Sequence, residues 1–408
     1  MEDKILKHGS IIFFASFISI FLGYIFHFYM ARALGPDDYG ILGSIISFIY
    51  IFSVPSTVLA TALAQVVAEL KGEGAYGKIK SIVLQSIRKL VYISLVIFIM
   101  LVLFSPVLKK VLNLPSEFPV VLLGISLIFI TILLSLRGVL QGLQEFNSLG
   151  LNMVLEKTVL LFIGVFLVYF GMGVNGAIIA YGFSALVVFL LALLPLKSIL
   201  ERKNEKIDIS IYKYASPIIV LLFCITIMSN IDIFFVRTYF SAEVSGYFNA
   251  IKTLGMVVYF ISLSLGMVLL PKVSEMSTLN KNQGLLLRKT LFYFCVLLGA
   301  ILFSYAIASD TIITILFGSD YSSVSGYLVW YSLTMGFLSY GIILMVYDVS
   351  MKKTVFRYPL ILFTLVQIFL LIVFHKTIDQ IIIVQAAAFL MLLVVLVLIK
   401  KRYGTSIK

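Results

Sequence analysis

Long apolar runs recur along almost the whole of this 408-residue chain. A helix needs about 20 predominantly apolar residues to cross a bilayer. Runs that fit this requirement cover residues 10–30, 41–67, 91–108, 120–140, 158–170, 177–196, 217–235, 247–270, 291–308, 326–347, 355–374 and 381–399. The run at 158–170 is short, so we expect its helix to begin near Leu149 and to carry Glu156 and Lys157 in its first turns. The pattern predicts an all-α polytopic membrane protein with about 12 transmembrane helices.

The composition excludes several other classes of protein. Hydrophobic residues make up 61% of the chain and charged residues 12%, and the mean hydropathy is +1.12. Soluble domains are about half apolar and about a quarter charged. The chain is therefore neither disordered nor fibrous, and we expect the lipid bilayer, and no nucleic acid, as its partner.

Basic residues predict the orientation of the helices, because cytoplasmic loops are enriched in Lys and Arg. With the N-terminus inside, 25 of the 31 basic residues fall in inner segments, Arg137 and Lys157 among them. We therefore expect a multi-pass protein of the cell membrane with both termini in the cytoplasm. Most of the net charge of +12 is then a topology signal.

Two stretches of the chain resemble each other weakly. Arg32 precedes Gly40 after the first run, and Arg237 precedes Gly246 after the seventh. Glu69 and Glu275 each follow the glycine of their copy by 29 residues. Since six runs separate the copies, they predict a parallel repeat, with six-helix bundles at 1–205 and 206–408 around a central cleft.

No pattern in the chain indicates catalysis. The three histidines, His8, His27 and His375, form no metal-binding pair. Residues 171–176 (GMGVNG) match the glycine spacing of a dinucleotide site, but they lie between two membrane helices without a preceding strand, so we interpret them as a turn. We expect no enzymatic activity, no catalytic residue, no metal and no cofactor.

Charged residues inside the apolar runs are candidate functional residues, because burying a charge in a bilayer is costly. Asp232 lies deep in the seventh run, Lys252 in the eighth, Asp348 at the inner end of the tenth and His27 near the outer end of the first. We interpret Asp232, Asp348 and His27 as candidate sites for proton or sodium coupling. The alternative is structural: Asp232 pairs with Lys252, and polar side chains hold helices together.

A second set of residues suits an anionic substrate. Asn230 shares a helix face with Arg237, and Asn249 shares a stripe with Lys252. Arg32 and Arg237 occupy matching places in the two copies. We predict that Arg32, Arg237, Lys252, Asn249 and Asn230 contact the substrate, although an arginine at an interface can also serve simply as an anchor.

Several motifs resemble those of a known family. Residues 31–40 (ARALGPDDYG) resemble the signature of polysaccharide-type flippases, the O-antigen and teichoic-acid exporters of the multidrug/oligosaccharidyl-lipid/polysaccharide superfamily. Looser matches are 137–142 (RGVLQG), 246–250 (GYFNA), 270–275 (LPKVSE) and 316–321 (LFGSDY). The resemblance runs in order along the chain.

The resemblance implies a V-shaped pair of six-helix bundles that opens alternately to each side of the membrane. It implies that a polyprenyl-linked oligosaccharide is carried from the inner to the outer leaflet, alongside glycan-assembly proteins. In this scheme Glu69 and Glu275, near Lys71 and Lys272, form ion pairs of an inner gate, unless they only anchor their helices at the interface.

Two other functions compete with this one. A multidrug cation exporter of the same superfamily would favour acids in its cleft, whereas the candidates here include three cations. A membrane-embedded glycan polymerase or ligase would need a large outer loop, and every predicted outer loop is short.

Overall fold

All regular secondary structure that is described is helical. The computed structural model describes residues 2–205, 216–278, 283–351 and 353–402. The prediction of an all-α fold is confirmed. The chain divides into two compact units, Met1–Leu222 and Phe223–Lys408. The boundary predicted at 205/206 adjoins residues 206–215, which lie outside the described ranges, so the division into 1–205 and 206–408 stays a prediction.

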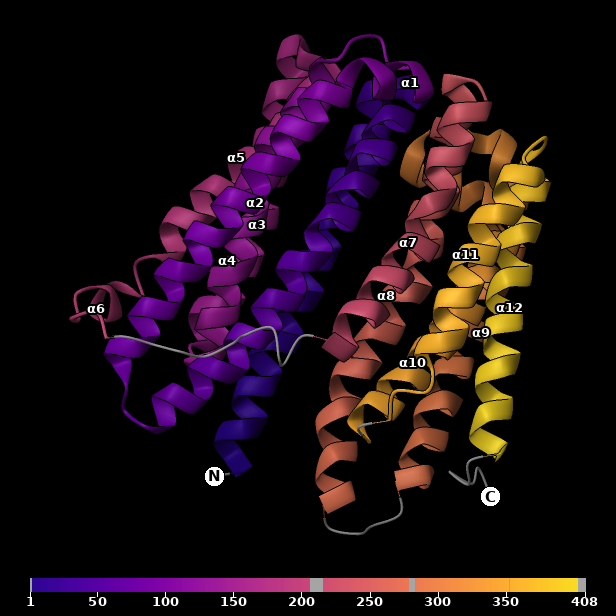
Figure 1. Cartoon of the computed structure of the whole chain (residues 1–408). Helices are drawn as coiled ribbons and strands as arrows, with labels where there is room; N and C mark the ends of the chain where they lie inside the picture. The colour runs from indigo at the N-terminus through magenta and orange to yellow at the C-terminus, as the bar shows by residue number, and fades with distance from the viewer. Residues whose placement is uncertain (1, 206–215, 279–282, 352, 403–408) are drawn as a thin grey trace. The chain divides into compact units, whose positions relative to one another are not determined.

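Each unit consists of long helices that pack against one another (Figure 1). The first unit holds α1 (Glu2–Gly72), α2 (Tyr76–Val111), α3 (Phe118–Gly142), α4 (Phe146–Leu167), the π-helical η1 (Val168–Met172), α5 (Gly173–Ala192) and α6 (Lys197–Leu200). α7 (Ser216–Tyr239) crosses the boundary between the units. The second unit continues with α8 (Ala242–Thr278), α9 (Gln283–Phe317), the 3-10 helix η3 (Ser319–Tyr327), α10 (Leu328–Ser350), α11 (Arg357–Val373) and α12 (Ile378–Arg402).

Glycines break two of these helical stretches. Gly35 has φ 73° within α1, directly before Pro36, and separates the apolar runs 10–30 and 41–67. Gly171, with φ 84°, and Gly173, with φ 52°, separate α4 from α5. Glycine adopts this left-handed region without the steric cost of a Cβ. The glycine-rich stretch 171–176 is therefore a turn followed by the start of a helix.

Within the described residues, nine helical stretches are long and apolar enough to cross a membrane. Two of them, Gly9–Gly72 and Phe146–Ala192, contain the glycine breaks and each joins two of the predicted runs. Arg357–Val373 is a shorter apolar helix. The chain is a multi-pass membrane protein, and the number of twelve crossings stays a prediction.

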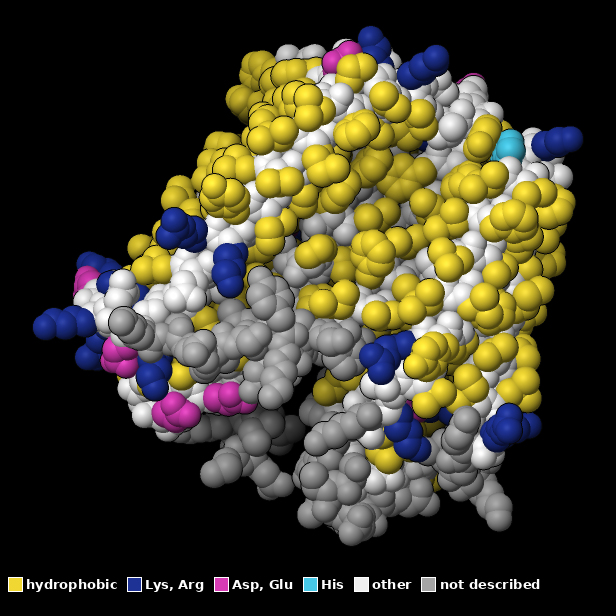
Figure 2. All heavy atoms as spheres, in the orientation of Figure 1, with side chains coloured by type: hydrophobic (Ala, Val, Ile, Leu, Met, Phe, Trp, Pro, Cys, Tyr) yellow, Lys and Arg dark blue, Asp and Glu magenta, His cyan; other side chains and the backbone are white. Residues whose placement is uncertain are grey.

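The outer faces of the helices are apolar. Figure 2 shows hydrophobic side chains spread over the visible faces of both units, with Lys and Arg mainly near helix ends and around α6. Large side chains such as Phe17, Leu103 and Phe303 are more than 60% exposed. This surface suits a lipid environment, in which apolar side chains need no cover.

The motif at 137–142 has a packing role. A Cβ on Gly138 would lie 2.2 Å from the carbonyl oxygen of Ala60, and one on Gly142 would lie 2.6 Å from that of Ala64. The two glycines form a GxxxG spacing, which lets helix backbones approach closely in membranes. They allow α3 to pack directly against the second half of α1.

We predict that Gly138→Ala destabilises the protein by about 1–3 kcal/mol, because the added methyl group collides with the backbone of α1. Thermal unfolding of the purified protein in detergent measures this loss. Gly299→Ala on α9 is the matched control, since a Cβ there meets no atom within 4 Å. Equal melting temperatures for the two variants would contradict the packing role of Gly138.

Candidate functional site

A fully buried carboxylate forms the centre of the second unit. Asp232 on α7 is 0% exposed, and each of its two carboxylate oxygens accepts two hydrogen bonds. Oδ1 accepts from the Lys252 ammonium at 2.8 Å and from the Ile233 backbone N–H at 2.8 Å. Oδ2 accepts from the Tyr331 hydroxyl at 2.6 Å and from the Gln385 amide at 3.0 Å.

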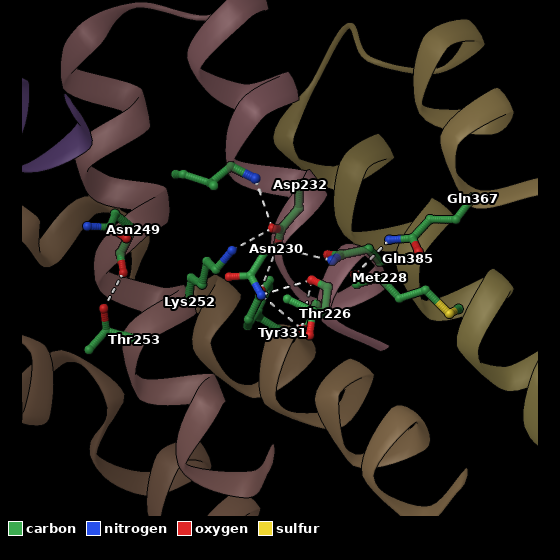
Figure 3. Close-up of polar contacts among 12 residues, drawn as sticks. Thr226, Met228, Asn230, Asp232, Asn249, Lys252, Thr253, Tyr331, Gln367 and Gln385 are labelled. Carbon is green, nitrogen blue, oxygen red and sulfur yellow. Dashed lines mark hydrogen bonds and ion pairs between the residues drawn. The ribbon is translucent and has the colours of Figure 1, made fainter. Parts of the chain in front are cut away.

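The donors to Asp232 come from different helices (Figure 3). Lys252 lies on α8, Tyr331 on α10 and Gln385 on α12. Gln367 on α11 adds a further link, because its amide donates to the Met228 carbonyl of α7 at 3.0 Å. We call Asp232, Lys252, Tyr331, Gln367 and Gln385 the Asp232 cluster. It ties α7 to α8, α10, α11 and α12.

Asp232 and Lys252 form an ion pair, as in the structural alternative in which the two residues pair and polar side chains hold the helices together. A carboxylate has about four acceptor positions, and here four donors fill them. Asp232 can take up a proton or a sodium ion only if Lys252 or another donor leaves, so its role in ion coupling stays a prediction. Lys252 is 5% exposed and committed to Asp232, so contact with a substrate requires that this ion pair opens.

The other predicted substrate residues of the second unit are also buried. Asn230 donates its amide to the Thr226 carbonyl at 2.9 Å and to the Ser229 hydroxyl at 3.0 Å, so it turns back onto its own helix. Asn249 is 4% exposed and Arg237 is 1% exposed. The described structure brings Asp232 and Lys252 together and leaves the substrate roles of these residues as predictions.

The two copies of the sequence repeat differ in burial. Arg32 is exposed, whereas Arg237 is among the largest fully buried side chains. Arg32 lies just before the break at Gly35, and Arg237 lies in the last turn of α7. Matching positions in the sequence therefore do not give these arginines matching environments.

The remaining predicted ion-coupling residues, His27 and Asp348, make contacts of their own. His27 is half-buried, with Nδ1 3.2 Å from the Tyr39 hydroxyl. Asp348 binds the Lys400 ammonium at 2.6 Å, which joins the ends of α10 and α12. Their ion-coupling roles stay predictions.

The predicted gate residues form no ion pair in the part of the chain that is described. Glu69 is exposed, and Lys71 instead donates to the Leu143 carbonyl at 2.5 Å. The side chain of Glu275 lies outside the described residues. The gate therefore stays a prediction.

The first unit contains a charged cluster that the sequence analysis did not select. One Glu156 oxygen lies 2.7 Å from the Arg137 guanidinium, and the other lies 3.0 Å from the Lys157 ammonium. Arg137 also donates to the Asn152 side chain at 2.7 Å. We call Arg137, Glu156 and Lys157 the Glu156 cluster. Two cations share one carboxylate, so the cluster carries one excess positive charge.

The position of Glu156 and Lys157 along α4 corrects the sequence interpretation. Lys157 is the twelfth residue of the 22-residue helix α4, and Glu156 is the eleventh. They lie at mid-helix, neither in the first turns nor in an inner loop. Because α4 begins at Phe146, these charges are about 16 Å from its start, at 1.5 Å per residue. The sequence signal for this cluster is the pair of adjacent charged residues, Glu156 and Lys157, directly before the short apolar run at 158–170.

The side chains of the Glu156 cluster are partly accessible. Those of Arg137 and Glu156 are 16% and 15% exposed, and that of Lys157 is 29% exposed. Lys157 lies 5.9 Å from the centre of the Tyr181 ring on α5 and within electrostatic range of His27 and Tyr50 on α1. A lysine in the middle of a membrane-spanning helix is costly against lipid, and the ion pair with Glu156 offsets part of that cost.

No group of three His, Cys, Asp or Glu residues is placed to hold a metal ion in the described ranges.

Residues 5–277 match the family described as polysaccharide biosynthesis protein. The chain belongs to this family. The resemblance inferred from residues 31–40 is thereby confirmed.

Solved transporter structures share this fold, and a membrane protein is related in sequence. An inward-facing multidrug resistance MATE transporter of the MOP superfamily aligns with a TM-score of 0.76 at 14% identity, over 94% of each chain. The lipid II flippase MurJ, in an inward closed conformation, aligns with a TM-score of 0.72 at 16% identity, over 95% of this chain and 87% of MurJ. A membrane protein of Methanocaldococcus jannaschii is 20% identical over 74% of this chain and 75% of its own length. The fold is that of MOP superfamily transporters.

We predict that Asp232→Asn and Lys252→Met each lower the stability of the protein by about 3–5 kcal/mol, because each leaves the other partner buried and uncompensated. The double variant should recover much of the loss. Thermal unfolding in detergent measures all three.

The control is Lys197→Met, which removes an exposed pair with Glu201 at 4.0 Å and should change little. Losses that simply add in the double variant would show that the buried pair is not a unit.

Proposed function

We propose that this protein carries a lipid-linked oligosaccharide, of the polyprenyl pyrophosphate type, from the inner to the outer leaflet of the cell membrane by alternating access. Membership of the polysaccharide biosynthesis family and the fold of MOP superfamily transporters support this. The protein would then be a transporter and no enzyme. Both termini would lie in the cytoplasm, and a proton or sodium gradient would drive the cycle.

The charges inside the membrane-spanning helices favour an anionic substrate. In the second unit the ion pairs Asp232–Lys252 and Asp348–Lys400 each match one acid with one base. In the first unit the Glu156 cluster has two bases for one acid. This excess positive charge, at mid-helix and partly accessible, is the observation that carries the proposal. A pyrophosphate crossing the membrane would neutralise it.

The lipid part of such a substrate needs no protein cover, because a polyprenyl chain can stay in the bilayer. The apolar helical faces are compatible with lipid on the outside of the protein. Only the headgroup needs polar surroundings while it crosses. Arg32, Arg237, Lys252, Asn230 and Asn249 remain the proposed headgroup contacts outside the Glu156 cluster, with glycan-assembly proteins as proposed partners.

A multidrug cation exporter is the second candidate, because the fold matches that of a multidrug resistance transporter. An organic cation would meet the excess positive charge of the Glu156 cluster. Like charges in a low-dielectric site repel strongly, so this candidate is less compatible with the structure than a carrier of anions.

We predict that the full-length protein in liposomes moves a fluorescent polyprenyl-pyrophosphate saccharide across the bilayer and leaves a cationic dye untransported. Dithionite quenching of the fluorescent lipid measures flipping, and protein-free liposomes give the background. Transport of the dye, together with flipping of the saccharide lipid no faster than in protein-free liposomes, would contradict the proposed function and favour the multidrug alternative.

A further inference from the structure

Asn152 on α4 connects three helices of the first unit through one buried amide. The residue is 4% exposed. Its Oδ1 accepts a hydrogen bond from Nε of Arg137 on α3 at 2.7 Å, and its Nδ2 donates to the Val188 carbonyl on α5 at 3.0 Å. The orientation of the amide is fixed, because a guanidinium can only donate and a carbonyl can only accept. The amide oxygen therefore points to Arg137.

Asn152 also determines the direction of the Arg137 guanidinium. Its side chain holds Nε, and its backbone carbonyl accepts from Nη2 at 3.1 Å. The same Nη2 lies 2.7 Å from a Glu156 oxygen. Because a guanidinium is planar, fixing two of its nitrogens also fixes the third. Among the described residues Nη1 makes no hydrogen bond, so its two N–H groups, on a side chain that is 16% exposed, remain for a ligand.

The amide of Asn152 holds Arg137 without cancelling its charge. In the described ranges Glu156 is the one carboxylate that pairs with the two bases of the Glu156 cluster, so the cluster keeps a net charge of +1. A carboxylate at position 152 would accept the same bond from Nε, but it would lower this net charge to zero. The uncharged side chain at position 152 therefore leaves positive charge for a ligand.

We propose that Asn152 is a positioning residue that makes the Glu156 cluster selective for anionic lipid headgroups. It holds Arg137 in place with an uncharged acceptor and leaves the net charge of +1 available to a phosphate. The inference rests on the proposed function and adds to it the residue that sets the preference for a charged over an uncharged headgroup. Asn152 acts through Arg137 and needs no contact with the substrate.

The test compares the affinity of the full-length protein in phosphatidylcholine nanodiscs for a polyprenyl phosphate and for the uncharged polyprenol, at pH 8. Asn152→Asp should lower the affinity for the phosphate about tenfold, because the net charge of the cluster falls to zero. The affinity for polyprenol should not change. Asn113→Asp is the matched control and should bind both lipids as the unchanged protein does, because Asn113 is exposed between α2 and α3 and lies outside the cluster.

A double variant separates the effect of charge from that of structure. Asn152 and Glu156 lie one turn apart, about 40° from each other around α4, and both contact Nη2 of Arg137. Asn152→Asp combined with Glu156→Gln therefore moves the acid by one turn and returns the net charge to +1. The affinity for the phosphate should recover to that of the unchanged protein. A purely structural role for Asn152 predicts a further loss, because the second substitution would add to the damage of the first.

Asn152→Ala provides a second test if the aspartate variant does not fold, which thermal unfolding in detergent measures. It keeps the net charge of +1 but removes the acceptor of Nε, so the Arg137 guanidinium is free to turn. We expect the affinity for the phosphate to fall about threefold to tenfold, the effect of one hydrogen bond. The affinity for polyprenol should again stay the same.

Two results would overturn the proposal and leave the proposed function in place, provided that the unchanged protein flips the saccharide lipid. One is an unchanged affinity for the phosphate in folded Asn152→Asp or Asn152→Ala. The other is a folded double variant that does not recover. The proposed function itself would fail in another way, because the unchanged protein would then neither prefer the phosphate to polyprenol nor flip the saccharide lipid.

Discussion

The cost of an uncompensated charge in an apolar medium governs this structure. On insertion scales a charged residue at the centre of a membrane helix costs about 2.5–3.5 kcal/mol, so each one must be paired or must face water. Asp232 meets this condition with four donors, among them Lys252 at 2.8 Å. Because these donors come from several helices, the hydrogen bonds that compensate one carboxylate also hold helices of the second unit together.

The first unit meets the same condition in another way. Glu156 compensates Arg137 and Lys157 only in part, and their side chains keep 15–29% of their surface accessible. The second unit therefore holds two balanced, buried ion pairs together with the fully buried Arg237, whereas the first holds an unbalanced and accessible cluster. The two copies of the sequence repeat also differ, since Arg32 is exposed and Arg237 is buried. A repeat in sequence does not require two equivalent sites.

Much of the fold could be predicted from the sequence, because membrane helices depend on long apolar runs that are visible in one dimension. The all-α class and the family followed from these runs and from residues 31–40. The position of Glu156 and Lys157 at the middle of α4 could not be predicted from apolar runs. The apolar run at 158–170 begins directly after them, so they resemble the start of a helix, and only the continuation of α4 back to Phe146 places them at its middle.

The candidate site was predictable only in part. Asp232 and Lys252 stand out as charges in apolar runs, and their pairing was one of two alternatives. Tyr331 and Gln385 carry no charge, and nothing in the sequence brings α10 and α12 to Asp232. The close packing of α1 on α4 depends on Gly150 and Ala15 meeting across two helices, a contact that no local pattern indicates.

The central claim is that the excess positive charge beside α4 binds an anionic lipid headgroup. The most direct measurement is the affinity of the full-length protein in nanodiscs for a polyprenyl phosphate, compared across Glu156→Gln, the unchanged protein and Lys157→Gln. The account predicts that affinity falls in that order, as the net charge of the cluster falls from +2 to +1 to 0. Equal affinities, or the reverse order, would contradict it.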